Sequence, residues 1–232
     1  MKTFNKALIG AIATLALSPA ANAISFDFSE VLGGAEGITG TSVTVNGIVA
    51  TGYNYADKAP LWIRNVPNDN GLGVCSEGKE ACDTLGGNVN ELDNMDSMER
   101  ILLENTNVGS KWTSLWVSSL DGNVYQVSGD ALVESGIVMW GNSLAELDGR
   151  NWFAFNFGDF GTSVEGDILT LAAAAGFDAS ARYLLFMPND QNGDDNDYLV
   201  WKGAVSDVPE PTTLAIFGLG LLGLGIARRK RA

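Results

Sequence analysis

The acidic stretch 190–197 holds the densest group of oxygen ligands in the sequence. Its residues Asp190, Asn192 and Asp194 lie two positions apart, like the first ligands of a calcium loop. An EF-hand also needs Gly at the sixth position and Glu at the twelfth, where this chain has Asp195 and Trp201, so the stretch is not an EF-hand. The stretch still predicts a calcium site with these ligands: Asp190, Asn192, Asp194, Asp195 and Asp197. A solvated acidic loop is the alternative, there and at the smaller group Asp93, Asn94 and Asp96.

Aromatic side chains are the second candidate for chemistry, because exposed Trp and Tyr rings stack on the faces of sugars. All six tryptophans lie between residues 24 and 207. Aromatic residues on strands usually belong to the core, so we expect four or more of the six to be mostly buried. Trp62, near the 68–73 loop, and Tyr55 are the residues that we predict to be exposed and able to contact a glycan.

The chain contains no histidine. This excludes Ser-His-Asp and Cys-His catalysis and every zinc or copper site with histidine ligands. Glycosidase chemistry needs only two facing carboxylates. With 27 acidic residues in 24–207, however, the sequence singles out no pair. We therefore predict a protein without enzymatic activity, and keep a carboxylate-dependent polysaccharide-acting enzyme as a minor alternative.

Charge bears on the partners of the chain. Residues 24–207 hold eight cationic and 27 acidic residues, a net charge of −19, whereas the whole chain has −14. Such a surface repels nucleic acid and anionic lipid, so we predict no nucleic-acid partner.

Cys75 and Cys82 are the only two cysteines. Outside the cytoplasm, a pair this close in sequence predicts a disulfide, with two free thiols as the alternative. Closing an eight-residue loop stabilises the fold by about 2.5 kcal/mol in the chain-entropy model. The bridge would fix a loop and leave the core to other interactions.

The two ends of the chain have the composition of targeting segments. Residues 1–23 combine a basic start, an apolar run from Ala7 to Leu17 and the small-residue site Ala21-Asn22-Ala23, as in a secretory signal peptide. Residues 208–232 hold the sequence Val208, Pro209, Glu210 and Pro211, then an uncharged run from Leu214 to Ala227. The basic residues Arg228, Arg229, Lys230 and Arg231 follow. The run is short for a transmembrane helix, but the cations after it would hold that end in the cytoplasm.

This order of a Pro-Glu-Pro motif, an apolar segment and a basic end resembles the PEP-CTERM sorting signal of Gram-negative bacteria. The resemblance covers about a tenth of the chain. It implies that exosortase, a membrane enzyme, processes the tail and releases or transfers the rest of the protein. It also implies a transient anchor in the inner membrane, then a place at the cell surface or in a matrix of extracellular polysaccharide. An ordinary C-terminal anchor is the alternative.

A second resemblance concerns three segments of residues 24–207. The order of Gly71-Leu72-Gly73-Val74, Glu91-Leu92-Asp93-Asn94 and Glu99-Arg100-Ile101-Leu102-Leu103 is similar to that in a group of PEP-CTERM proteins. The resemblance implies a β-sandwich and assigns no binding residue and no enzymatic activity.

The elements that would position these residues are mostly short strands. Alternating or β-branched runs separated by turn residues predict the following strands: 24–28, 42–53 with an Asn46-Gly47 turn, 61–66, 98–103, 112–120, 123–127, 136–140, 151–157, 167–171, 182–187 and 198–205. Short helical turns are expected at 130–135, 143–147 and 171–176. Many short strands with glycine-rich turns predict an antiparallel β-sandwich of jelly-roll type. The predicted parts are a signal peptide (1–23), this ectodomain (24–207) and a sorting tail with one transmembrane helix (208–232).

Two main hypotheses for function follow. The first is an exported, non-catalytic protein of the cell surface or extracellular matrix that associates with exopolysaccharide. The second is a carbohydrate-binding module. No cofactor other than calcium is expected.

Overall fold

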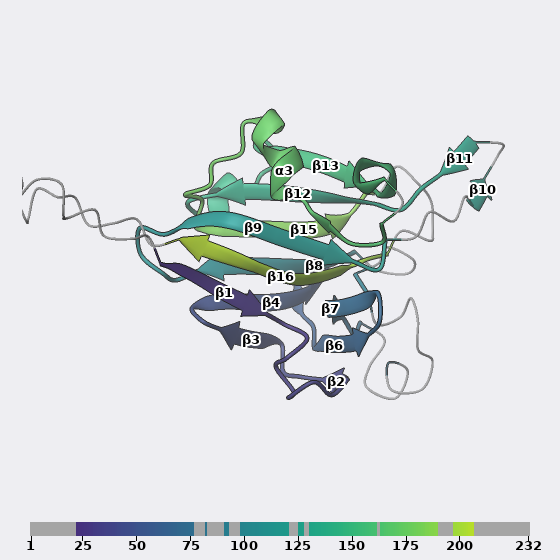
Figure 1. Ribbon diagram of the computed structural model, residues 1–232, viewed down its shortest axis with the longest axis horizontal. Coiled ribbons are helices and arrows are strands. Elements are labelled where there is room, and N and C mark those ends of the chain that lie inside the picture. Colours follow the sequence, from purple (N-terminus) through teal and green to yellow (C-terminus); the bar gives the residue numbers. More distant parts are fainter. Residues whose placement is uncertain are drawn as a thin grey trace, which may run out of the picture. The chain divides into compact units, whose positions relative to one another are not determined.

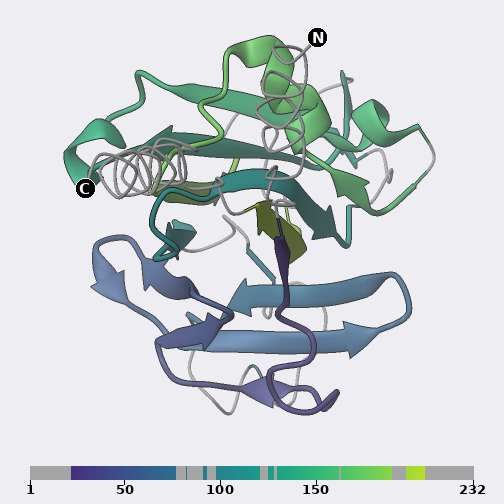
Figure 2. The same cartoon turned by 60° about the vertical axis from the view of Figure 1, so that its left-hand side comes forward.

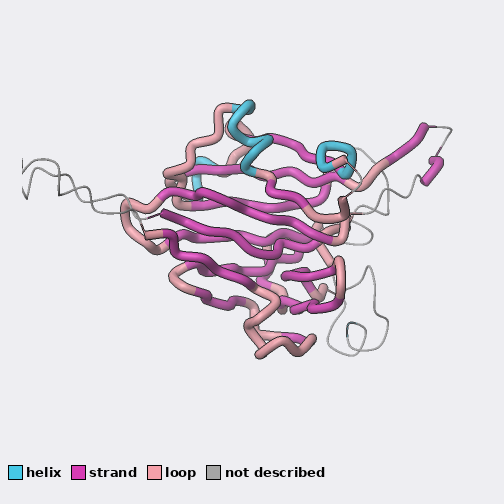
Figure 3. The backbone as a smooth tube through the Cα atoms, viewed as in Figure 1, coloured by secondary structure: helices cyan, strands magenta, loops and turns pink. Residues whose placement is uncertain are grey.

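The computed structural model describes residues 22–76, 82, 91–92, 98–120, 125–127, 130–161, 163–189 and 197–206. The predicted signal peptide and sorting tail lie outside this part of the chain, apart from Asn22 and Ala23. Residues Ala23–Ser206 form one compact unit. It consists mainly of β-strands, with only short helices (Figure 3).

Most strands belong to two antiparallel sheets, which Figures 1 and 2 show from two directions. The strand order in sheet A is β14-β9-β16-β7-β6-β2, and β1 also pairs with β16. The strands of sheet A are β1 (Ala23–Asp27), β2 (Gly37–Ile38), β6 (Leu61–Val66), β7 (Asp69–Val74), β9 (Lys111–Ser118), β14 (Gly166–Asp167) and β16 (Leu199–Ser206).

The strand order in sheet B is β13-β12-β15-β8-β4-β3, and β5 also pairs with β4. The strands of sheet B are β3 (Ser42–Val45), β4 (Ile48–Asn54), β5 (Asp57–Lys58), β8 (Glu99–Asn105), β12 (Ser135–Gly141), β13 (Trp152–Asn156) and β15 (Tyr183–Pro188). A separate hairpin joins β10 (Tyr125–Val127) and β11 (Asp130–Leu132).

One hydrophobic core joins the two sheets. Leu115 and Val117 of sheet A are fully buried in the same cluster as Leu184 and Phe186 of sheet B. These side chains alternate with more exposed ones along each strand, because successive side chains of a strand point to opposite faces. The alternation that predicted the strands therefore also explains the core. The prediction of a mainly β fold with antiparallel sheets is confirmed.

The β3–β4 hairpin has the turn that its sequence predicts. Asn46 and Gly47 have φ values of 49° and 79°, which a two-residue type I′ turn requires and which Asn and Gly tolerate best. The cross-strand pair Val45–Ile48 closes the turn.

Three local predictions were wrong or incomplete. The predicted strand 167–171 stops after Asp167 and continues as α3 (Leu169–Ala172) and the 3₁₀ turn η4 (Ala173–Ala175). Asp167 causes this change, because its Oδ1 accepts hydrogen bonds from the N–H groups of Leu115 in sheet A and Leu169 in α3. The helical turn predicted at 130–135 is instead β11 and the start of β12, since hairpin pairing outweighs the weak helix propensity there. Strands β2, β5 and β7 were not predicted.

The other short helices are η2 (Leu144–Glu146), within the predicted turn 143–147, and η3 (Phe157–Phe160). Within the described residues, no helix is long and apolar enough to cross a membrane. The predicted membrane segment Leu214–Ala227 lies outside them.

Candidate functional site

A buried acidic cluster lies where β6, β7 and β16 meet the segment 91–92. It consists of Asp69, Glu91 and Asp197 with Arg64. The Arg64 guanidinium donates to Glu91 Oε1 at 2.6 Å and forms an ion pair with Asp69 Oδ2 at 3.2 Å. The backbone holds Glu91 in place, because its carbonyl accepts from the Val74 N–H and the Leu92 N–H donates to Tyr198. Glu91 is 4% exposed and Asp197 5% exposed.

The environment of Glu91 favours its neutral form. Burial, followed by the nearby Asp197 carboxylate, raises the pKa of Glu91 to about 8. The Ser119 hydroxyl and the Arg64 guanidinium act in the opposite direction but do not compensate. The Glu91 and Asp69 carboxylates therefore share the Arg64 guanidinium, and the buried surroundings of Glu91 favour its protonated form. Since Glu91 and Asp197 are both buried, this pair is out of reach of a polysaccharide chain.

Asp197 is the single predicted calcium ligand that falls within the described residues, where it belongs to the buried acidic cluster. The predicted ligands Asp190, Asn192, Asp194 and Asp195 lie outside, as do Asp93, Asn94 and Asp96. Across the described part of the chain, no group of three or more Asp, Glu or Cys residues is arranged to hold a metal ion.

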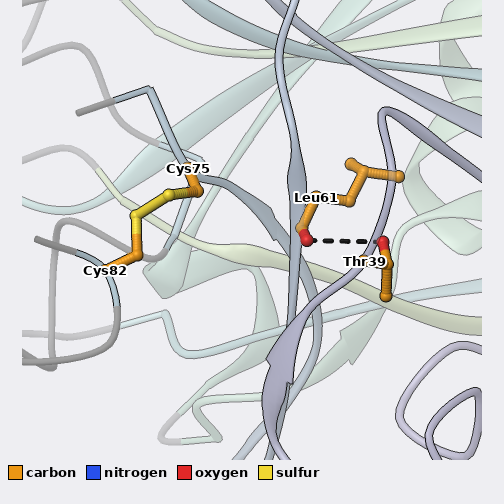
Figure 4. The surroundings of a disulfide bond; sticks show 4 residues. All are labelled: Thr39, Leu61, Cys75 and Cys82. Carbon is orange, nitrogen blue, oxygen red and sulfur yellow. Dashed lines mark hydrogen bonds between the residues drawn. A yellow bond between two sulfur atoms is a disulfide. The ribbon is translucent and has the colours of Figure 1, made fainter. Parts of the chain in front are cut away.

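Cys75 and Cys82 form the predicted disulfide, with Cα atoms 6.0 Å apart (Figure 4). The Cys75 N–H donates to the Pro60 carbonyl, which ties the end of β7 to the start of β6. Next to it, the Thr39 hydroxyl donates to the Leu61 carbonyl at 3.3 Å, as the dashed line in Figure 4 shows. The bridge thus joins the end of β7 to Cys82, and both cysteines pack with Trp62 of β6 and Ile38 of β2.

The two residues predicted to contact glycans differ in exposure. Trp62 is 8% exposed and packs against both cysteines and Ile38, so its prediction as an exposed sugar platform was wrong. The disulfide supplies the apolar contact that covers its ring. Tyr55 is 58% exposed in the turn after β4, as expected. No other aromatic residue among the described residues lies against it in a ring contact.

Another aromatic group, which the sequence did not single out, lies on the outer face of sheet A. Trp116 of β9 lies opposite Trp201 and Lys202 of β16, because a β-bulge places one extra residue in β16 between Val200 and Gly203. The indole rings of Trp116 and Trp201 meet edge to face, with centroids 6.4 Å apart. The Lys202 ammonium lies 3.3 Å from the Trp201 ring centroid and 5.2 Å from that of Trp116. We call these three residues the Trp–Lys cluster.

The remaining tryptophans follow the expected division between core and surface. Trp112 and Trp140 are buried, Trp116 and Trp201 are half-buried, and Trp152 is 51% exposed on β13. Their alternation along strands does not reveal which of the half-buried rings meet. That contact depends on the register between β9 and β16 and on the bulge.

Comparison with known proteins identifies the tail. Residues 207–231 match the PEP-CTERM protein-sorting motif, and the match includes the Val208–Pro211 sequence, the apolar run and the basic residues 228–231. No curated protein and no solved structure matches the chain. The motif is the signal of exported proteins that exosortase sorts to the cell surface. The chain is therefore a PEP-CTERM domain-containing protein.

Proposed function

We propose that the protein is a non-catalytic component of the cell surface or of the extracellular polysaccharide matrix, and that exosortase delivers it there. The observation that carries this proposal is the sorting motif at 207–231. In this proposal residues 1–23 are a cleaved signal peptide and residues 24–207 are the exported ectodomain. Residues 208–232 anchor the chain in the inner membrane until they are processed. We also propose that the two sheets are connected as in a β-sandwich of jelly-roll type.

Two features support a role outside the cytoplasm. The disulfide between Cys75 and Cys82 is typical of oxidising compartments. The acidic ectodomain, with a net charge of −19, favours solubility and repels anionic surfaces.

A role as a carbohydrate-binding module is the second candidate, and the exposed part of the Trp–Lys cluster favours it. No observation favours the carboxylate-dependent enzyme.

Changing the tail is expected to change where the ectodomain accumulates. Deleting residues 208–232 removes both anchor and motif, so the protein should leave the membrane fraction without reaching the cell surface. The double variant Pro209→Ala/Pro211→Ala keeps the apolar run and the basic end, and should remain unprocessed in the inner membrane. Cell fractionation and immunoblotting of surface, membrane and medium would measure both results. Unaltered surface localisation of both variants would rule out sorting through this tail.

Calcium binding by 190–197 is a separate part of the proposal. If the carboxylates there bind calcium, the melting temperature should be higher in calcium than in EDTA, because a ligand that binds only the folded state stabilises it. Asp194→Ala should abolish the difference. Asp148→Ala, which removes an exposed ion pair with Arg150 elsewhere on the surface, serves as the control and should preserve it. Equal melting temperatures of the wild type in calcium and EDTA would eliminate the calcium site.

A further inference from the structure

An open hollow of about 470 Å³ lies over β1, β9 and β16, which are neighbouring strands in Figure 1. Its lining includes Ser25, Asp27, Glu30, Ser114, Trp116 and Lys202. We propose that this hollow binds one pyranose unit of a neutral glycan chain. The inference rests on the proposed function, since it gives the surface protein a ligand class and a site.

The strand registers place the lining residues of β1, β9 and β16 on the outer face of sheet A, and Val45 and Asn46 of the β3–β4 hairpin complete the lining. Phe26 of β1 and Leu115 of β9 point into the core and are at most 3% exposed. Their neighbours Asp27 and Ser114 therefore point outward, since side chains alternate along a strand. In β16 the bulge adds Lys202 to the outward face, directly opposite Asp27 of β1. Three strands thus bring one aromatic ring and several polar groups together.

Trp116 provides the platform for the sugar ring. The edge-to-face contact with Trp201, at an interplanar angle of 83°, holds its indole in one orientation. A fixed aromatic ring loses little conformational entropy on binding and presents a flat apolar surface with a negative face. The C–H groups on one side of a pyranose ring are complementary to such a surface. The size of the hollow is in the range of small-molecule sites in proteins.

The polar groups of the hollow match the hydroxyl groups of a sugar. Asp27 Oδ1 accepts hydrogen bonds from the N–H of Ser29 at 3.0 Å and from its hydroxyl at 2.6 Å, so this carboxylate is fixed before a ligand arrives. Lys202 is the Cα register partner of Asp27 and lines the same hollow, so the hollow holds a charged donor as well as this acceptor. Adjacent hydroxyls of a sugar can donate to one group and accept from the other, and hydrogen bonds to charged groups are the stronger kind.

Charge selects a neutral glycan over other ligands. The Asp27 and Glu30 carboxylates in the hollow and the net charge of −19 repel an anionic polysaccharide. A cationic ligand on Trp116 would meet the Lys202 ammonium, which lies 5.2 Å from the Trp116 ring centroid and already occupies the face of Trp201 at 3.3 Å. A neutral saccharide meets neither repulsion.

Affinity electrophoresis of the full-length protein in mild detergent tests the inference. The gels contain hydroxyethylcellulose, galactomannan or dextran as neutral polymers, or carboxymethylcellulose as an anionic polymer with the backbone of hydroxyethylcellulose. At least one neutral polymer should retard the protein, and carboxymethylcellulose should do so at least tenfold more weakly than hydroxyethylcellulose or not at all. No retardation by any of the three neutral polymers would overturn the proposal, and so would retardation by carboxymethylcellulose as strong as the strongest retardation by a neutral polymer.

Variants locate the site. Trp116→Ala should weaken retardation at least tenfold, and Trp116→Phe, which keeps a smaller ring, should weaken it less. Trp152→Ala is the matched control, because it removes an exposed tryptophan from β13 in the other sheet and should leave retardation unchanged. Melting curves verify that the variants fold, and the tryptophan fluorescence change on binding should be absent in Trp116→Phe. If Trp116→Ala and Trp152→Ala had equal effects on retardation, the hollow would not be the site.

The outcome separates this site from the proposed function. A protein that reaches the surface through its tail but binds no neutral glycan would refute the site alone. A protein that binds the glycan but is not sorted through its tail would refute the delivery by exosortase alone.

Discussion

Raising the pH from 5 to 9 is expected to lower the free energy of unfolding by ~2–4 kcal/mol through Glu91 alone. The folded protein holds a proton on Glu91 with a pKa of about 8, whereas the unfolded chain releases it near the ordinary value of 4.5. Between these pH values the folded state binds more protons than the unfolded chain. The contribution of Glu91 to the free energy of unfolding is therefore fully present below pH 4.5 and is lost as the pH rises through 8. Because the chain contains no histidine, no imidazole titrates in this window.

Glu91→Gln isolates the effect. An uncharged side chain of the same shape should match the wild type near pH 5 and be more stable at pH 9, with a flatter dependence between them. Glu104→Gln is the control: it removes a surface carboxylate paired with Arg182 and should keep the wild-type slope. Chemical denaturation at several pH values would measure the slopes. The same slope in Glu91→Gln and the wild type would show that Glu91 does not hold the proton.

Replacing Gly71 with Ala is expected to destabilise the fold by about 3 kcal/mol or more. Gly71 lies in β7 with a φ of 140°, and a Cβ there would come within 2.6 Å of the Val200 carbonyl oxygen and 2.8 Å of the Trp201 Cα. These are backbone atoms of β16, so they cannot move aside as a flexible side chain would. For a domain of this size the loss corresponds to roughly 6–12 °C in melting temperature.

Gly109→Ala is the control for backbone conformation alone. Gly109 also has a positive φ, 79°, but a Cβ there meets nothing within 4 Å, so the loss should be only about 1 kcal/mol. Because Gly71 contacts the backbone beside the β16 bulge, Gly71→Ala should also disturb the Trp–Lys cluster and weaken glycan retardation. Equal losses of stability in Gly71→Ala and Gly109→Ala would mean that the β16 backbone leaves room for a Cβ at position 71.

Strands with clear local signals could be predicted from the sequence, and β7 shows where such prediction fails. Leu61–Val66 was predicted with its observed limits, because its apolar residues and the proline after it are local signals. β7 contains Gly71 and Gly73, which reduce the strand signal, yet the first of them is the residue that allows the strand to approach β16. The weak local signal and the close packing thus have the same cause.

The candidate sites depend on long-range pairing that the sequence does not reveal. The buried acidic cluster joins Arg64 with Glu91 and Asp197, and the Trp–Lys cluster joins Trp116 with residues 85 and 86 positions later in the chain. Neither set follows a spacing rule. The sorting motif, in contrast, is linear, so its residues were predicted from the sequence without any knowledge of the fold.

The position of β16 makes the ectodomain depend on its last exported residues. β16 is the final strand of the unit Ala23–Ser206. It pairs with β9 and β7, and also with β1, which is the first strand of the unit. Sheet A therefore lacks its centre until residues 199–206 are free to pair, and the pairing of β1 with β16 joins strands that are far apart in the sequence. Such long-range pairing folds slowly and leaves strand edges exposed in the meantime. On the proposed route, the chain would complete sheet A only when the sorting tail itself emerges, so that folding of the ectodomain and processing of the tail would be consecutive events.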